Sequence, residues 1–374
     1  MSLTAKIPRA ALPASDEERL DWLQLARSRR VGPVTFIRLL REHGSAAAAL
    51  AALPEIARAA NVENYAAFPR DEARREYETG LKSGARLLCL GAPDYPPLLA
   101  LIPDPPPLLW SIGDRALAAR DCIALVGARN ASSLGLRMAA ALARDLSGHG
   151  FTVVSGLARG IDAAAHRAAL DGGTIAVQAG GVDTIYPREN AELSEKIAKS
   201  GLRLSEMPIG ITPQARHFPR RNRLISGLSR ALVVIEGASR SGSLITARDA
   251  LDQGREVMAV PGNPFDARAA GCNMLIRDGA TLVRSADDII AALAPAEPEP
   301  HPAPPPAPPP PGGDLAARVL SLLGPTPIPE DMLIRETGHP SAAVLSTLVD
   351  LEIAQKITRA EGGTVALQTR DPAA

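Results

Sequence analysis

The chain has 374 residues, and its 41 basic side chains equal its 41 acidic ones. The length predicts two or three domains, and 46% hydrophobic with 22% charged residues is typical of a globular protein. Cys89, Cys122 and Cys272 lie far apart, which argues against a disulfide framework or a zinc site and fits a reducing cytosol. No stretch approaches the ~20 apolar residues of a membrane span, and no apolar run resembles a signal peptide, so we expect a soluble cytoplasmic protein.

Residues 1–84 are predicted to form a helical N-terminal domain of the SAM or helix-hairpin-helix kind. Ser15 precedes three acidic residues, a pattern typical of a helix start. Gly32–Pro33 indicates a turn, and the helix after it places apolar residues at Phe36, Leu39 and Leu40. A glycine-containing turn between two short helices resembles the helix-hairpin-helix element of DNA-binding proteins. A packed helical domain with a Gly-Pro turn is the alternative interpretation, and it is the more common one.

Residues 85–294 are predicted to form an α/β domain. Between 121 and 284, short β-prone runs alternate with helical segments, as in DCIALVGA followed by SSLGLRMAAALARDLSGHG. The runs FTVVSGL, TIAVQAGG, LRLSEMP, ALVVIEGA and EVMAVPG repeat this arrangement. Nearly unbroken apolar strands separated by helices are typical of a parallel sheet with helices on both faces. We therefore expect an extended Rossmann-like, doubly wound parallel sheet.

A proline-rich linker, residues 295–313, separates this domain from the last segment. Eleven of its nineteen residues are proline, which favours an extended polyproline spacer. Residues 314–374 contain three helical stretches and a predicted hairpin that turns at Gly362–Gly363, which indicates a winged helix. Its would-be recognition helix, roughly Ser341 to Ile353, has no lysine or arginine and carries Asp350 and Glu352. Because these acids repel phosphate, we expect the tail to make a protein contact or to have an accessory role.

Glycine, small hydroxyl residues and arginine recur where the predicted strands end and helices begin. The segments are GARNAS, SGLARGID and EGASRSGSLIT. Since ligands of open α/β sheets bind beyond the carboxyl ends of the strands, these loops should meet at one edge. Glycine lets backbone approach a ligand closely, a helix N-terminus offers N–H groups, and arginine clamps phosphate. The sequence therefore predicts a groove with several phosphate sites.

An arginine-rich segment, HFPRRNRLISGLSR from His217 to Arg230, opens a further helix at that edge. Together with Arg216 it holds five arginines in fifteen residues and no acid. The first loop is not G-x-G-x-x-G and no Walker A loop is present, which argues against a nicotinamide cofactor and against ATP hydrolysis by that route. Spaced cations suit a polyanion, and Phe218 is placed to stack on an unpaired base, so a strand explains the pattern better than one mononucleotide. The predicted groove cations are Arg129, Arg159, Arg220, Arg221, Arg223 and Arg240.

Two pairs of side chains have a catalytic interpretation. Asp162 and His166 lie four residues apart, but an acid in the first turn of a helix and a packed histidine explain them better. Glu206 and Glu236 follow the fourth and fifth predicted strands and would be the acid or base of a nucleotide hydrolase. A carboxylate that holds an arginine in place is the favoured interpretation, and the hydrolase stays the alternative function.

Seven motifs together resemble the core of the DprA/Smf family of bacterial DNA-processing proteins. They are VGARNAS, SGLARGIDAAAH, SEMP, FPRRNRLISGLS, SGSLITA, GREVMAVPG and GCNMLIRDGA, and their order and spacing also agree. The resemblance runs from about Arg86 to about Leu293. It implies a binding protein rather than an enzyme, without cofactor or metal. Its implied function is to bind and protect incoming single-stranded DNA and to load the RecA recombinase during natural transformation or homologous recombination. It also implies a homodimer formed through the Rossmann-like domain.

The family's DNA-contacting positions can be carried onto this chain residue by residue. The resemblance implies that DNA is bound by Gly127, Arg129, Ser132, Ser155, Gly156, Arg159, Gly160, Gly180, Gly181, Phe218, Arg220, Arg221, Asn222, Arg223, Ser241, Gly242 and Ser243.

Overall fold

The computed structural model describes residues 7–294, 314–360 and 362–368. The chain divides into two compact units, Met1–Ala294 and Pro295–Ala374. The predicted linker, 295–313, lies outside the described residues.

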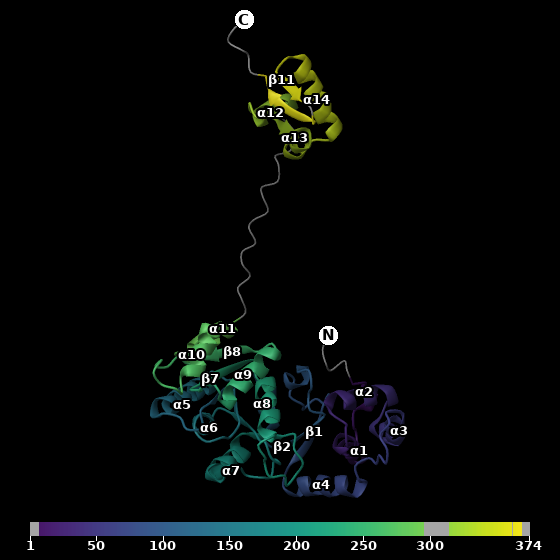
Figure 1. The fold of residues 1–374 in the computed structure, drawn as a ribbon, viewed down its shortest axis with the longest axis vertical. Helices are drawn as coiled ribbons and strands as arrows, with labels where there is room; N and C mark the ends of the chain where they lie inside the picture. The colour runs from purple at the N-terminus through teal and green to yellow at the C-terminus, as the bar shows by residue number, and fades with distance from the viewer. Residues whose placement is uncertain (1–6, 295–313, 361, 369–374) are drawn as a thin grey trace. The chain divides into compact units, whose positions relative to one another are not determined.

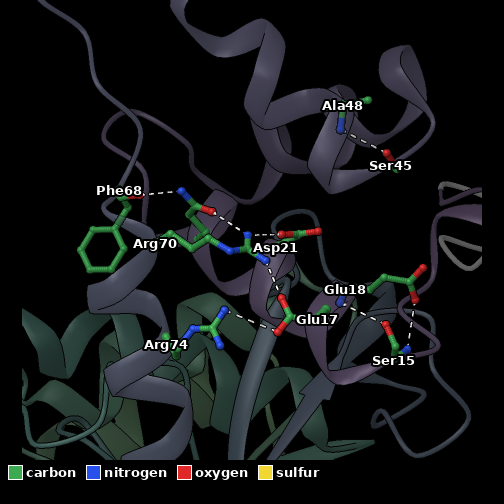
Figure 2. Close-up of polar contacts among 10 residues, drawn as sticks. Ser15, Glu17, Glu18, Asp21, Ser45, Ala48, Phe68, Arg70 and Arg74 are labelled. Carbon is green, nitrogen blue, oxygen red and sulfur yellow. Dashed lines mark hydrogen bonds and ion pairs between the residues drawn. The ribbon is translucent and has the colours of Figure 1, made fainter.

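Four helices form the N-terminal part of the first unit (Figure 1). They are α1 (Asp16–Arg27), α2 (Pro33–His43), α3 (Ala46–Ala59) and α4 (Arg70–Lys82). Ser15 caps α1 as expected, and its backbone N–H donates in return to Glu18 (Figure 2). The predicted turn is confirmed, since Gly32 is the N-cap of α2 and Pro33 its first residue. Phe36, Leu39 and Leu40 are fully buried.

Arg70 fastens α4 to α1. Its guanidinium lies 2.7 Å from a Glu17 carboxylate oxygen and 2.5 Å from one of Asp21 (Figure 2). Arg70 and Glu17 are largely exposed and Asp21 is partly buried, so the pairs orient the helices more than they stabilise them.

The four helices share a core with the sheet. Trp110 of β2 (Leu108–Gly113) is buried, and its indole N–H donates to Glu76 of α4 at 2.9 Å. Arg27 of α1 pairs with the same carboxylate at 2.8 Å. A Cβ at Gly80 would come within 2.5 Å of the Trp110 ring, so α4 packs directly on that side chain.

A nine-stranded sheet forms the centre of the unit, in the order β1-β2-β6-β5-β4-β3-β7-β8-β9. Strands β3 to β9 pair in parallel, which confirms the predicted doubly wound Rossmann-like sheet. Their bounds are β3 (Cys122–Gly127), β4 (Thr152–Ser155), β5 (Thr174–Val177), β6 (Leu202–Ser205), β7 (Ala231–Ile235), β8 (Glu256–Ala259) and β9 (Thr281–Leu282). The antiparallel pair β1 (Arg86–Cys89) and β2, which joins β6, was not predicted.

Helices cover both faces of this sheet (Figure 1). They are α5 (Ser133–Gly148), α6 (Ile161–Ala168), α7 (Ala191–Ser200), α8 (His217–Leu228), α9 (Gly242–Asp252), α10 (Ala270–Arg277) and α11 (Ala286–Leu293). Short 3-10 helices lie at Arg9–Ala11, Leu99–Leu101, Arg115–Ala119 and Arg188–Asn190. Alternate residues of β3 enter different cores: Ile123 packs with α5 and α6, and Ala124 packs in the core that contains α8 and α9. This alternation explains why β3 is apolar along its whole length.

The second unit is the predicted winged helix. Its elements are α12 (Leu315–Leu322), β10 (Ile328–Pro329), α13 (Glu330–Thr337), α14 (Ser341–Ile353), β11 (Ile357–Ala360) and β12 (Thr364–Leu367). Gly362 and Gly363 of the hairpin both have positive φ, 92° and 70°, which glycine adopts easily. The exposed face of α14 carries Leu345, Val349 and Ile353 beside its acids.

Candidate functional site at the carboxyl edge of the sheet

Two adjoining pockets lie where the parallel strands end. The first pocket has a volume of 730 Å³ and is lined by the loops after β4 and β5 and by the start of α8. The second pocket, of 560 Å³, is lined by the loop after β3, α8 and the start of α9. Four residues border both pockets and form the wall between them: Arg129, Ala158, Phe218 and Arg221.

The structure brings most of the predicted residues to these pockets. The first pocket is lined by Arg129, Gly156, Arg159, Gly180, Phe218 and Arg221. The second pocket is lined by Gly127, Arg129, Phe218, Arg221, Asn222, Ser241, Gly242 and Ser243. The predicted residues that line neither are Ser132, Ser155, Gly160, Gly181, Arg220, Arg223 and the groove cation Arg240.

Arg129 and Phe218 form the exposed part of the dividing wall. The Arg129 guanidinium carbon lies 5.0 Å from the centre of the Phe218 ring, a cation–π contact. Arg129 is exposed and has no ion pair among the described residues. The pair therefore offers an uncompensated positive charge beside an aromatic ring.

The sequence segment contains no acid, which indicated an unpaired arginine cluster, but the fold brings acidic partners to it from elsewhere in the chain. Arg223 lies 2.5 Å from Glu206 and 3.4 Å from Asp104, and Arg230 lies 2.7 Å from Asp121. Arg220 is exposed and only loosely paired, 3.7 Å from Glu206. The expectation of an unpaired cluster was therefore wrong for Arg223 and Arg230.

Arg221 is buried at the centre of the site, with 6% of its surface exposed. Its Nη1 donates to the carbonyl oxygens of Gly156 and Val177, each at 2.5 Å. Burial lowers the pKa of the guanidinium to about 10, and the nearby Asp162 carboxylate opposes this shift. Arg221 therefore stays charged at neutral pH and ties the loops after β4 and β5 to α8.

Gly156→Ala should destabilise the first unit. A Cβ there would lie 2.3–2.5 Å from the Arg221 guanidinium, so the arginine would have to leave its two carbonyl partners. We expect a loss of about 1–3 kcal/mol in the free energy of unfolding, measured by denaturant titration. Gly148→Ala is the matched control, because no atom lies within 4 Å of its Cβ position. Equal stability of the two variants would contradict the assigned role of Arg221.

The helix N-termini at this edge differ in whether their backbone N–H groups are already hydrogen-bonded within the protein. Ser132 caps α5 and accepts from Gly135, and its own N–H and hydroxyl donate to Glu236, so the loop already fills this terminus. At α9, the N–H groups of Gly242 and Ser243 make no hydrogen bond to a described residue. The sequence predicted free N–H groups at the helix N-terminus after each of these loops. In the structure the N-terminus of α9, at the second pocket, is open, and that of α5 is not.

Two of the predicted glycines are required by the protein's own packing. A Cβ at Gly127 would lie 1.9 Å from the carbonyl oxygen of Ile235 on β7. Gly160 has φ of 76° and faces the Ala128 carbonyl at 2.2 Å from its Cβ position. Both positions therefore need glycine whether or not a ligand approaches.

Asp162 and His166, the first pair with a catalytic interpretation, are held by hydrogen bonds within the protein. Asp162 accepts from the N–H groups of Gly156 and Ala158, and His166 bonds to Leu157 and Thr174. Burial lowers the pKa of His166 to about 3, so its ring is neutral near pH 7. The favoured interpretation for this pair is thus supported.

The two glutamates are also occupied. Glu206 holds Arg223, which is the role that we favoured. Glu236 instead holds the backbone N–H and hydroxyl of Ser132, so for this residue the expected arginine partner was wrong.

Tyr186 and Arg188 line the first pocket and were missed. Tyr186 lies in the loop after β5, where we singled out Gly180–Gly181, and Arg188 directly follows that loop. The sequence signal is present in TIYPREN, an aromatic residue and an arginine two positions apart beyond a strand end. Arg188 is exposed and has no ion pair among the described residues.

Family models match all three parts of the chain. The model described as DNA recombination-mediator protein A matches residues 86–294, which is more than half of the chain. The chain belongs to the DprA/Smf family. A DprA-like N-terminal HHH domain matches 16–79, which supports the helix-hairpin-helix interpretation over the packed helical domain that we ranked above it. A DprA winged helix domain matches 302–363.

Curated DprA/Smf relatives support the same assignment. DNA processing protein DprA from Bacillus subtilis is 45% identical over 57% of this chain and 72% of its own length. Protein Smf from Escherichia coli is 38% identical over 73% of this chain and 75% of its own length.

Two solved DprA structures resemble this one. That from Streptococcus pneumoniae has a TM-score of 0.62 and 33% identity, covering 74% of this chain and 98% of its own. That from Helicobacter pylori, described for its single-stranded DNA binding mode, has a TM-score of 0.52 and 29% identity, covering 56% and 95%. Within the described part of the chain, no helix is long and apolar enough to cross a membrane, and no three metal-ligating side chains gather.

Proposed function

We propose that this protein binds single-stranded DNA along the two pockets and acts as a recombination mediator rather than as an enzyme. The observation that carries the proposal is the Arg129–Phe218 wall, where an unpaired guanidinium and an aromatic ring border both pockets. Single-strand binders combine these two features, because the cation attracts phosphate and the ring stacks on a base.

The second pocket supplies the phosphate-binding groups of this proposal. The open N-terminus of α9 directs the N–H groups of Gly242 and Ser243 toward it. Arg240 precedes this helix, is exposed, and has no ion pair among the described residues. A helix N-terminus and an arginine together are suited to a phosphodiester.

The finer parts of the proposal come from the family. We propose that the chain protects incoming single strands and loads the RecA recombinase during natural transformation or homologous recombination, working as a homodimer in the cytoplasm. Support comes from the family model for a recombination mediator and from the Helicobacter pylori relative described for its single-stranded DNA binding.

Nucleotide hydrolysis is less well supported. Both glutamates at the edge already bind groups of the protein, Glu206 an arginine and Glu236 the cap of α5. A general acid or base needs a carboxylate that can reach the substrate proton.

Fluorescence anisotropy of a labelled single-stranded oligonucleotide tests the proposal. We expect single strands to bind in preference to duplex and mononucleotides. Four exposed arginines at the edge, Arg129, Arg188, Arg216 and Arg240, have no ion pair among the described residues. At ~0.7 per phosphate contact, they predict a slope of log affinity against log salt of about −3. Binding of a mononucleotide but not of strands, with turnover, would instead support the hydrolase.

A further inference from the structure

Helix α14 of the second unit has an apolar stripe on its exposed face. Leu345, Val349 and Ile353 are 38%, 42% and 76% exposed, and Ala342 continues the stripe toward the start of the helix. These residues are three or four positions apart, so they lie on one face. The opposite face packs in the core of the unit through Val344, Leu348 and Leu351. A helix that is apolar on both faces is usually covered on both.

Two acids flank the stripe near the C-terminal end of the helix. Asp350 follows Val349 by one residue and Glu352 precedes Ile353 by one, so each lies about 100° around the helix from the stripe, on opposite sides. Asp350 is exposed and has no ion pair among the described residues. Glu352 is 42% exposed and pairs only loosely with Arg359, at 3.8 Å. The stripe therefore has a negative charge on each side.

These acids lie at the end of the helix that is least favourable for them. The C-terminal end of a helix carries a partial negative charge and favours lysine or arginine. The last turn of α14 contains no basic residue, and neither does the rest of the helix. A departure from a local rule of this kind is typical of a functional surface. The cations that would balance this end of the helix are therefore absent from α14 itself.

We propose that the exposed face of α14 binds a basic amphipathic helix of a partner protein. The apolar side chains of the partner cover the stripe, and lysines or arginines beside them pair with Asp350 and Glu352, as flanking charges do between paired helices. The protein contact expected of the acidic tail then has a defined surface. This surface shares no residue with the two pockets, so the proposed function and this contact can fail independently.

Two other occupants fit the face less well. Nucleic acid is disfavoured, because both acids repel phosphate. A second copy of α14 would cover the stripe, but it has no lysine or arginine to pair with either acid. A parallel pair of these helices would also place the acids of one copy near those of the other. A basic partner is the occupant that satisfies both the apolar stripe and its negative margins.

Two labelled synthetic peptides test this proposal against the full chain. Both carry the same helical leucine stripe, flanked by lysines in one peptide and by glutamates in the other. We expect fluorescence anisotropy to show binding of the lysine peptide and at least about ten-fold weaker binding of the glutamate peptide, because like charges are then brought together. Binding of the lysine peptide should weaken as salt is added.

Two substitutions on α14 locate the contact. Val349→Ser should weaken binding of the lysine peptide about five-fold, because part of the apolar contact is lost. Asp350→Lys should weaken it about five-fold as well and reduce its salt dependence, because an ion pair is lost. Glu78→Lys is the matched control, since it makes the same change of charge at an exposed acid of α4, and we expect parental binding there. The two substituted positions on α14 are exposed, so both variants should fold.

Three results would overturn the proposal. One is equal binding of both peptides, or parental binding of the lysine peptide by both α14 variants. Another is a change in the sedimentation of the full chain on Val349→Ser when the parent binds neither peptide, which would assign the face to self-association. The last is a loss of duplex binding in Val349→Ser, which would assign the face to nucleic acid. Binding of single strands should stay parental in both variants, so it separates this contact from the proposed function.

Discussion

Arg129→Ala should weaken binding of a single-stranded oligonucleotide roughly 10- to 100-fold, since a hydrogen bond to a charged group contributes about 1.5–3 kcal/mol. Arg129 borders both pockets, lies 5.0 Å from Phe218, and has no acidic partner among the described residues. Its loss should also make the salt slope about 0.7 less steep, the value for one phosphate contact on a single strand. Anisotropy titrations at several salt concentrations measure both quantities.

Arg144→Ala is the matched control for this result. Arg144 is exposed and unpaired among the described residues, but it lies toward the C-terminal end of α5, away from the edge of the pockets. We expect less than a two-fold change there and the parental slope. Arg129→Lys should keep the slope and lose part of the affinity, because lysine keeps the charge without the planar group. Parental binding by Arg129→Ala at every salt concentration would show that the interface is elsewhere.

The sequence predicted the parallel sheet well, because its central strands β4, β5, β6 and β7 are buried along their whole length, and β3 is buried except at its last residue. Ile123 and Ala124 enter opposite cores, so β3 is one apolar run, and such runs are recognisable without knowing their neighbours. The antiparallel strands β1 and β2 were missed for a physical reason. They lie on either side of a proline-rich segment, and the pairing of β2 with β6 joins residues about ninety positions apart, which no local pattern encodes.

The same limit explains the errors at the site. Consecutive residues of a helix point about 100° apart, so Arg220 is exposed while Arg221 is buried. The acids that pair with Arg223 lie 17 and 119 residues away along the chain. A count of charges in the segment could not find these partners. The exposed ring of Tyr186 depends on how its loop is anchored, which is equally non-local.

The loops at the edge therefore divide into two groups. Glu236 occupies the N–H group of Ser132 at the start of α5, and Asp162 occupies two N–H groups of the loop after β4. Arg221 joins that loop to the end of β5. These contacts hold the backbone in one arrangement. The open N-terminus of α9 and the unpaired arginines are then presented by a rigid frame, so that less entropy is lost when a strand binds.

Arg223→Ala tests whether this arginine belongs to the contacts that hold the backbone or to the groups that bind a strand. Arg223 and Glu206 are 13% and 9% exposed and 2.5 Å apart, and Arg223 also donates to the Asp104 carbonyl at 2.7 Å. Removing the arginine leaves the buried Glu206 carboxylate with only its loose contact to exposed Arg220 at 3.7 Å, which should lower the free energy of unfolding by about 3–5 kcal/mol. Denaturant titration measures this loss, and the protein that remains folded should keep the parental salt slope.

A double-mutant cycle with Glu206→Gln makes this assignment decisive. If the arginine acts through Glu206, the double variant should be more stable than the sum of the single losses predicts, because the neutral amide is no longer an uncompensated charge. The opposite pattern would be an Arg223→Ala protein as stable as the parent with a salt slope less steep by about 0.7. That result would make Arg223 a phosphate contact, as its sequence context indicated, and its pairing with Glu206 would then be a contact that DNA displaces.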